Sequence, residues 1–210
     1  MSDIDQKDII ELSATPSNPT FYFNIIVKDE AGNRAAYSAV KNLDFALTSS
    51  ASDGGFDSGS AFGVEFKDNY AGQCTGQNNF PKLAWQNPPL GTQSFAIVVD
   101  DPSGGDWVHL NLFNISATVT NIPKTVGGGN VPDLSIYGTQ GKNSWDGTGN
   151  SHSTGWAGPC PPSGSHTYYF KIYALSMASI TINNAKNRSQ FDTAFSGTII
   201  AAAEISGFSN

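Results

Sequence analysis

Residues 158–175 decide the fold class, and they read Gly-Pro-Cys-Pro-Pro-Ser-Gly-Ser-His-Thr-Tyr-Tyr-Phe-Lys-Ile-Tyr-Ala-Leu. The aromatic and aliphatic run at residues 168–175 is typical of a β-strand. The prolines that precede it fix the backbone and indicate a stiff loop at the mouth of that strand. In such a loop, neighbouring backbone N–H groups can point into a cavity at little entropic cost. The stretch therefore predicts a strand that begins beside a preformed loop.

After residue 43 the chain alternates short apolar runs with turns. Further strands are expected at residues 44–48, 94–99, 109–114 and 202–208. One helix is expected near the C-terminus, because Phe191 and Phe195 stand four residues apart. Asn187 or Ser189 can cap that helix. We therefore predict a mostly β fold with one or two short helices near the C-terminus.

Composition disfavours several classes of function. The formal net charge of −7 argues against a nucleic-acid partner, because phosphate-binding surfaces of that kind carry a basic stripe. Hydrophobic residues make up 39% of the chain, enough to offset chain entropy, so a folded domain is expected. No run approaches the roughly 18 apolar residues of a membrane span. The first residues are acidic and lack the apolar segment of a signal peptide, so none is expected.

The N-terminal part differs in texture from the rest. Residues 1–12 are polar and acidic and are predicted to be a tail. Residues 13–41 hold two β-rich runs around the turn Asp-Glu-Ala-Gly-Asn at 29–33, which predicts a β-hairpin extension. The hairpin resembles the last two strands of bacterial immunoglobulin-like or fibronectin-like repeats. An ordinary hairpin of the main domain, residues 42–210, is the alternative.

Four pairs or runs of residues carry distinctive chemistry. They are Cys-Thr-Gly-Gln-Asn at 74–78 before Pro-Lys-Leu-Ala-Trp at 81–85, Asp-Asp-Pro at 100–102 before Trp-Val-His at 107–109, Gly-Lys-Asn-Ser-Trp at 141–145, and Gly-Pro-Cys-Pro-Pro at 158–162 before His-Thr-Tyr at 166–168. In this order they resemble the phosphatidylethanolamine-binding protein (PEBP) family, especially its bacterial Raf-kinase-inhibitor-like branch. The match runs from about residue 43 to residue 208, close to 80% of the chain.

The resemblance implies an antiparallel β-sandwich over residues 42–210, with a small surface pocket for phosphate or a phosphorylated head group. Carried over residue by residue, the ligand-binding set is Asp101, Trp107, His109, Trp156, Cys160, Pro161, Pro162, His166 and Tyr168. In this set Trp156 is expected at the pocket rim. Asn143 matches the family's loop asparagine and is expected to hold the loop in shape. No cofactor and no metal are implied.

The residue types support an anion pocket on their own. Two imidazoles, a phenol and free backbone N–H groups can donate hydrogen bonds to an anion without any lysine or arginine. Asp101 is expected to accept a hydrogen bond from His109 and to raise the pKa of that ring, or else to face an amine. His152 is expected to be a solvated loop residue. Trp85 is expected in the core and Trp107 in the pocket.

The two cysteines leave both a disulfide and two free thiols open, and they form no zinc pattern with the three histidines. The resemblance places the motifs around Cys74 and Cys160 near one another, so we predict a disulfide between them. A disulfide favours a periplasmic or secreted location, whereas buried thiols would suit the cytoplasm.

The predicted function is a non-enzymatic binding or regulatory domain for a small anion such as phosphate or a phosphoethanolamine-like group. The resemblance also implies inhibition of a kinase or protease, with the protein partner left open. One alternative is a small hydrolase that uses His109 and Asp101 as a dyad. It is disfavoured because no Gly-x-Ser-x-Gly nucleophile motif is present. The other alternative is a secreted adhesion or assembly module, suggested by the hairpin at residues 13–41.

Overall fold

The computed structural model describes residues 20–28, 31–42, 44–69, 74–182 and 188–210, and the predicted tail at residues 1–12 lies outside them. The chain divides into two compact units, Met1–Asp44 and Phe45–Asn210. The first unit holds β1 (Thr20–Lys28) and β2 (Arg34–Asn42), paired antiparallel so that Thr20 faces Asn42 and Lys28 faces Arg34. The two strands form an antiparallel β-hairpin.

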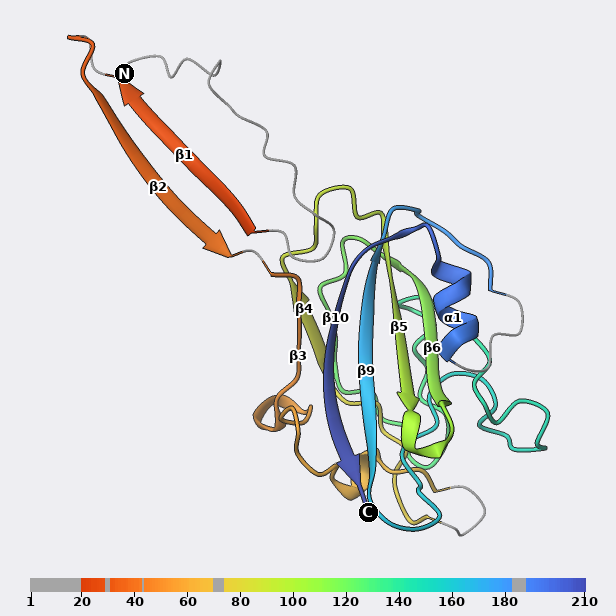
Figure 1. Ribbon diagram of the computed structural model, residues 1–210. Helices are drawn as coiled ribbons and strands as arrows, with labels where there is room; N and C mark the ends of the chain where they lie inside the picture. Colours follow the sequence, from red (N-terminus) through yellow and green to blue (C-terminus); the bar gives the residue numbers. More distant parts are fainter. Residues whose placement is uncertain (1–19, 29–30, 43, 70–73, 183–187) are drawn as a thin grey trace. The chain divides into compact units, whose positions relative to one another are not determined.

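The described residues of the second unit form two antiparallel sheets and one short α-helix (Figure 1). The five-stranded sheet runs in the order β10 (Ile199–Ser209), β9 (His166–Leu175), β5 (Ser94–Asp101), β6 (Trp107–Ser116), β8 (Thr139–Gln140), and the three-stranded sheet in the order β3 (Ala46–Thr48), β4 (Leu83–Gln86), β7 (Asn121–Ile122). The 3-10 helices are η2 (Ala51–Asp53), η3 (Val64–Phe66) and η5 (Pro102–Gly104), and the α-helix is α1 (Arg188–Phe195). The predicted mostly β class with a short helix near the C-terminus is confirmed.

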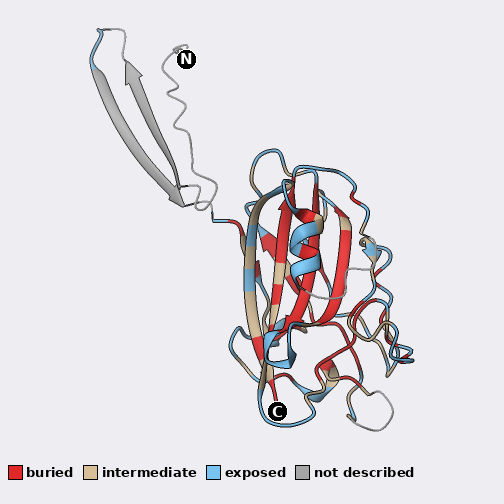
Figure 2. Cartoon of the chain, turned by 45° about the vertical axis from the view of Figure 1, so that its right-hand side comes forward, coloured by how far each residue is buried: buried red, intermediate tan, exposed pale blue. Residues whose placement is uncertain are grey.

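Strand β5 lies in the middle of the larger sheet, and all eight of its residues are buried (Figure 2). Its apolar side chains divide between two clusters, as the alternation of a strand requires. Phe95, Ile97 and Val99 join the main core, whereas Ala96 and Val98 join the cluster that holds residues of α1. Trp85 on β4 packs in the main core with only 4% of its surface exposed, as predicted.

Helix α1 covers the second face of the larger sheet through the two phenylalanines that predicted it. Phe191 and Phe195 are both fully buried, and Phe195 packs against Tyr173 of β9. The predicted cap Asn187 lies outside the described residues, and Ser189 is the second residue of the helix rather than its cap. Among the described residues, no helix is long and apolar enough to cross a membrane.

One end of the larger sheet brings three strand ends together. Strand β5 ends at Asp101, η5 turns the chain, and β6 begins at Trp107, directly opposite Asp101. Strand β9 begins at His166 and runs antiparallel to β5, with Tyr169 opposite Asp100. The long loop between β8 and β9 packs over the same end. Polar residues from four segments therefore meet where the sheet terminates.

Candidate anion-binding pocket

A cavity of about 310 Å³ opens at this end of the larger sheet. The residues that line it are Asp101, Gly104, Trp107, His109, Trp145, Cys160, Pro161, Pro162, His166 and Tyr168. The structure thus brings together every predicted ligand-binding residue except Trp156. Gly104 and Trp145 were not predicted as pocket residues, although Trp145 closes one of the quoted motifs.

Asp101 lines the cavity and is only 4% exposed. Its Oδ1 accepts a hydrogen bond from the backbone N–H of Gly104 at 3.0 Å, which caps η5. Its Oδ2 accepts one from Nδ1 of His166 at 2.6 Å. A Cβ on residue 104 would stand 2.8 Å from that same Oδ2, so a larger residue there would displace the carboxylate. Asp101 therefore leaves Nε2 of His166 as the ring nitrogen available to a ligand.

The expected partnership of Asp101 with His109 is wrong. Nδ1 of His109 donates instead to the backbone carbonyl of Ala157 at 2.6 Å, and the ring is 5% exposed. The reason is the register of β6: Trp107 faces Asp101, so His109 lies two residues deeper and reaches the loop. Burial is the largest influence on this ring and lowers its pKa, although the Ala157 carbonyl and the charge of Asp101 act in the opposite direction.

The hydrogen bond to Ala157 fixes the tautomer of His109. Because a carbonyl oxygen can only accept, Nδ1 carries the hydrogen, and in the neutral ring Nε2 is an acceptor. Tyr168 packs edge-on against this ring, with centroids 5.0 Å apart. Burial, followed by the charge of Asp101, raises the pKa of Tyr168, so its phenol stays a hydrogen-bond donor.

Asn143 shapes the loop over the cavity. Its side-chain amide is fully buried and donates to the carbonyls of His152 at 2.6 Å and Gly155 at 3.0 Å. Its Oδ1 accepts from the N–H of Trp145 at 2.9 Å. These three contacts fold the loop back on itself.

Trp156 lies in the core rather than at the pocket rim. It is fully buried, its Nε1 donates to the carbonyl of Asn79 at 3.1 Å, and it packs edge-on against Phe80. The tryptophan therefore supports His109 from behind, with ring centroids 6.5 Å apart. Its neighbour in sequence, Ala157, is the residue that meets the pocket histidine.

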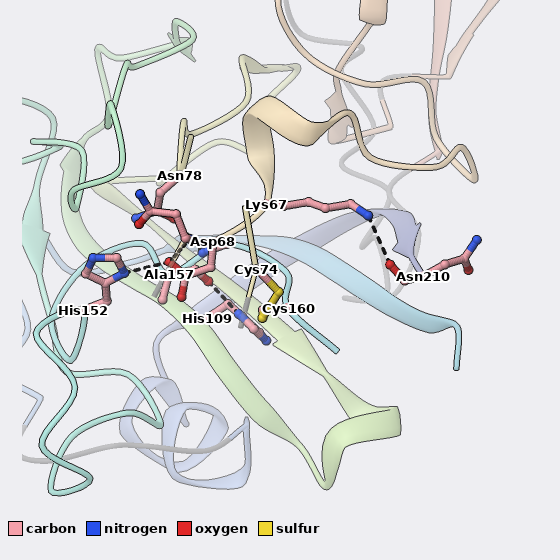
Figure 3. The surroundings of a disulfide bond; sticks show 11 residues. Lys67, Asp68, Cys74, Asn78, His109, His152, Ala157, Cys160 and Asn210 are labelled. Atoms are coloured by element: carbon pink, nitrogen blue, oxygen red, sulfur yellow. Dashed lines mark hydrogen bonds and ion pairs between the residues drawn. A yellow bond between two sulfur atoms is a disulfide. The ribbon is translucent and has the colours of Figure 1, made fainter. Parts of the chain in front are cut away.

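The expectation that His152 is a solvated loop residue is wrong. The residue is buried, with 6% of its surface exposed. Its Nδ1 lies 2.8 Å from Oδ1 of Asp68, whose side chain is fully buried. The sequence signalled no partner for this histidine, because Asp68 stands 84 residues away. The two residues cross-link the loop after η3 with the loop before β9 (Figure 3).

The disulfide between Cys74 and Cys160 joins the same two loops, with Cα atoms 5.9 Å apart (Figure 3). Asn78 adds hydrogen bonds, because its Oδ1 accepts from the N–H of Gly158 at 2.8 Å. The N–H of Asp68 donates to the carbonyl of Pro159 at 3.1 Å. A Cβ on Gly158 would come within 2.1 Å of the Phe66 carbonyl oxygen, so this crossing also requires glycine. The wall of the pocket is thus fixed to a second loop over residues 158–160.

The described residues contain no cluster of three or more histidine, cysteine or acidic side chains able to hold a metal ion. Fold and pocket together define a class: β-sandwich domains with a cavity at one end of the larger sheet. The family described as phosphatidylethanolamine-binding protein matches residues 56–210. The chain belongs to that family.

The relatives place the chain in the branch that contains YbcL. It is 35% identical to the UPF0098 protein YbcL of Escherichia coli K12 over 137 residues, 63% of this chain and 72% of that protein. It is 33% identical to a UPF0098 protein of Methanothermobacter thermautotrophicus, over 64% of this chain and 84% of that protein.

Solved structures show the same fold. The crystal structure of E. coli YbcL, described as a new member of the mammalian PEBP family, superposes with a TM-score of 0.63 at 30% identity, covering 79% of this chain and 98% of that one. A PEBP homologue from Chlamydia trachomatis superposes with a TM-score of 0.57 at 27% identity, covering 78% and 95%.

Proposed function

We propose that this domain binds a small anion, phosphate or a phosphorylated head group, and that it does so without catalysis. The observation that supports this most is the convergence of His109, His166 and Tyr168 on one cavity. None of the described residues that line the cavity is a lysine or arginine. Recognition therefore rests on imidazole and phenol donors.

The protonation state of His109 gives the site a definite chemistry. In the free protein the lowered pKa favours a neutral ring, whose Nε2 accepts rather than donates. A bound anion favours the imidazolium, because an opposite charge nearby stabilises the charged form. Anion binding therefore takes up a proton, and Tyr168 supplies a donor that needs no such change.

The hydrolase alternative loses its specific support. It required Asp101 to orient His109, whereas Asp101 pairs with His166 and His109 pairs with a backbone carbonyl. The sulfur of Cys160, which lines the cavity, is engaged in a disulfide. The remaining arrangement is one of positioned donors, which suits binding.

The disulfide also supports an extracytoplasmic location, since disulfides persist in oxidising compartments. The adhesion-module alternative rests on the hairpin of β1 and β2 and stays a prediction from the sequence.

Isothermal titration calorimetry with inorganic phosphate tests the proposal. The wild-type protein should bind phosphate saturably, and His109→Ala should lose most of the affinity. Tyr168→Phe removes one donor and keeps the ring, so it should weaken binding with an unchanged far-ultraviolet spectrum. Ile136→Ala, at a loop side chain that is 77% exposed, is the matched control and should bind like the wild type. Binding that is unaffected by both pocket variants would refute the assignment.

A further inference from the structure

The larger sheet has a second end, opposite the cavity, that presents apolar side chains to solvent. Ser94 of β5 faces Leu175 of β9 there, and Leu175 also pairs with Ile199 of β10. In Figure 1 this end lies at the top, whereas the turn between β5 and β6 lies at the bottom. Three large apolar side chains are exposed on the segments that meet here: Leu90 is 99% exposed, Met177 48% and Ile199 40%.

The segments that carry these side chains lie against one another. A Cβ on Gly91, the neighbour of Leu90, would stand 3.9 Å from Cδ1 of Ile200. The N–H of Ser176 donates to the carbonyl of Thr198 at 2.8 Å. These contacts bring together the loop before β5, the loop after β9 and the turn before β10, so the exposed side chains belong to one surface.

The strand ends and loops that form this surface carry no formal charge. The chain has 18 acidic and 11 basic residues, yet residues 87–99, 113–123, 172–182 and 193–203 contain no aspartate, glutamate, lysine or arginine. These ranges hold the parts of β5, β6, β9 and β10 that meet here, with their adjoining loops. Covering them therefore removes no charged side chain of these segments from water, which would be the most costly step.

The hydroxyl groups of the same segments already have acceptors within the protein. Four of them donate to main-chain carbonyls nearby: Thr92 to Pro89, Ser94 to Met177, Ser176 to Thr198, and Thr198 to Phe195. These hydroxyls stay satisfied when water is excluded, which keeps the cost of covering the surface low. The bond from Thr92 also closes the turn that presents Leu90, so this side chain projects from a preformed loop.

We propose that this end of the domain docks reversibly on a zwitterionic lipid surface, with Leu90, Met177 and Ile199 inserted among the lipids. Three side chains on separate loops expose an area on the order of 300 Å², well below the roughly 800 Å² per partner that a stable protein interface buries. A fluid lipid surface needs no matching shape. A zwitterionic surface fits because the formal net charge is −7 and these segments hold no lysine or arginine to attract anionic lipids.

The size of the apolar group sets the expected strength. The three side chains together hold about a dozen apolar atoms, close to a single myristoyl chain, for which the association constant with a membrane is about 10⁴ M⁻¹. We therefore expect weak, reversible docking that does not depend on the proposed anion site.

Co-sedimentation of the full chain with phosphatidylcholine vesicles tests the inference, because this lipid has neither a net charge nor an ethanolamine group. The wild type should bind with a constant of about 10⁴ M⁻¹ that added salt leaves unchanged and added phosphatidylserine lowers. Leu90→Ser should weaken binding by about tenfold or more, and Leu90→Asp should abolish it. Val126→Ser and Val126→Asp change a side chain that is 73% exposed outside these segments. These matched controls should bind like the wild type.

Each other outcome would overturn the inference and leave the anion site untouched. Absence of vesicle binding by the wild type, or equal binding by Leu90→Asp, would exclude this surface as a lipid-docking site. Binding that requires phosphatidylserine and weakens with salt would contradict the zwitterionic preference. A dimer that forms without lipid and dissociates in Leu90→Asp, seen by sedimentation velocity, would assign the surface to a second copy of this chain instead.

Discussion

The molecule contains the same chemical pair in two different surroundings. Asp101 and His166 lie 2.6 Å apart at the edge of the cavity, with side chains 5% and 15% exposed. Asp68 and His152 lie 2.8 Å apart outside the lining of the cavity, with side chains 0% and 7% exposed. In the first pair, Nδ1 of the imidazole donates to the aspartate, and Nε2 stays available to a ligand. The second pair joins two long loops.

The difference shows how surroundings assign a role to a residue type. A buried pair depends on the contact between its two members, because an unpaired buried charge costs several kcal/mol. A pair that lines a cavity can keep one ring nitrogen for an incoming ligand. We therefore expect Asp68 and His152 to matter for stability, and Asp101 and His166 to matter for binding.

Loss of the disulfide should have the largest effect on stability and binding. The disulfide joins the loop after η3, which carries Asp68, to the loop in which Cys160 lines the cavity. It closes a separation of 86 residues, for which loop-closure entropy gives about 4–5 kcal/mol of stabilisation before strain. Denaturant unfolding of the wild type and the Cys74→Ser/Cys160→Ser protein should differ by that order. Phosphate affinity should fall as well, because Cys160 lines the cavity. Two alkyl adducts on unreduced protein from its native compartment would contradict the bridge.

Loss of the buried histidine comes next. His152→Ala leaves Asp68 buried without its ring partner and should lower the free energy of unfolding by about 3–5 kcal/mol. Lys82→Ala breaks the exposed pair with Asp53 and should cost no more than about 1 kcal/mol. Denaturant titrations of both variants check this. Equal costs would show that burial does not distinguish the two pairs.

Trp85 and Trp107 test the same contrast between a residue that matters for stability and one that matters for binding. Trp85→Ala empties a core position and should cost roughly 3–5 kcal/mol of stability. Trp107→Ala should weaken ligand binding more than it lowers the melting temperature, because Trp107 is half-buried and lines the cavity. Thermal melts and phosphate titrations of both variants make the comparison. Similar losses of stability with unaltered binding would remove the distinction.

The smallest effect is a pH dependence, best measured with sulfate because its charge does not change near neutrality. Burial lowers the pKa of free His109 below 6.5, and a bound anion raises it. The affinity for sulfate should therefore be greatest below the pKa that His109 has in the free protein. The affinity should fall by up to about tenfold per pH unit as the pH rises toward the pKa that His109 has in the complex. His109→Gln should flatten the profile; an unchanged slope would exclude this histidine as the linked group.

Local pattern predicted the strands that are long enough to show one. The runs at 94–99 and 168–175 lie inside β5 and β9, because both are apolar and bounded by turn residues. Strands β7 and β8 have two residues each, too few for any periodicity to signal them. Eight of the nine ligand-binding residues predicted from the motifs line the cavity.

Pairings that depend on register and long-range contact were beyond the sequence. The choice of His166 over His109 as partner of Asp101 follows from where β6 begins opposite β5. The burial of Trp156 depends on its bond to Asn79, 77 residues away. Neither the strand register nor a contact across 77 residues leaves a signal in the local sequence pattern.

The most direct test of the anion site uses the three histidines of the chain as reporters. Nitrogen-15 NMR of the imidazole rings can follow His109, His152 and His166 during a titration with inorganic phosphate. We expect saturable shifts at Nε2 of His109 and His166, a change of His109 toward the imidazolium form, and an unchanged spectrum for His152. A titration that leaves His109 and His166 unmoved, or that moves His152 equally, would contradict the account.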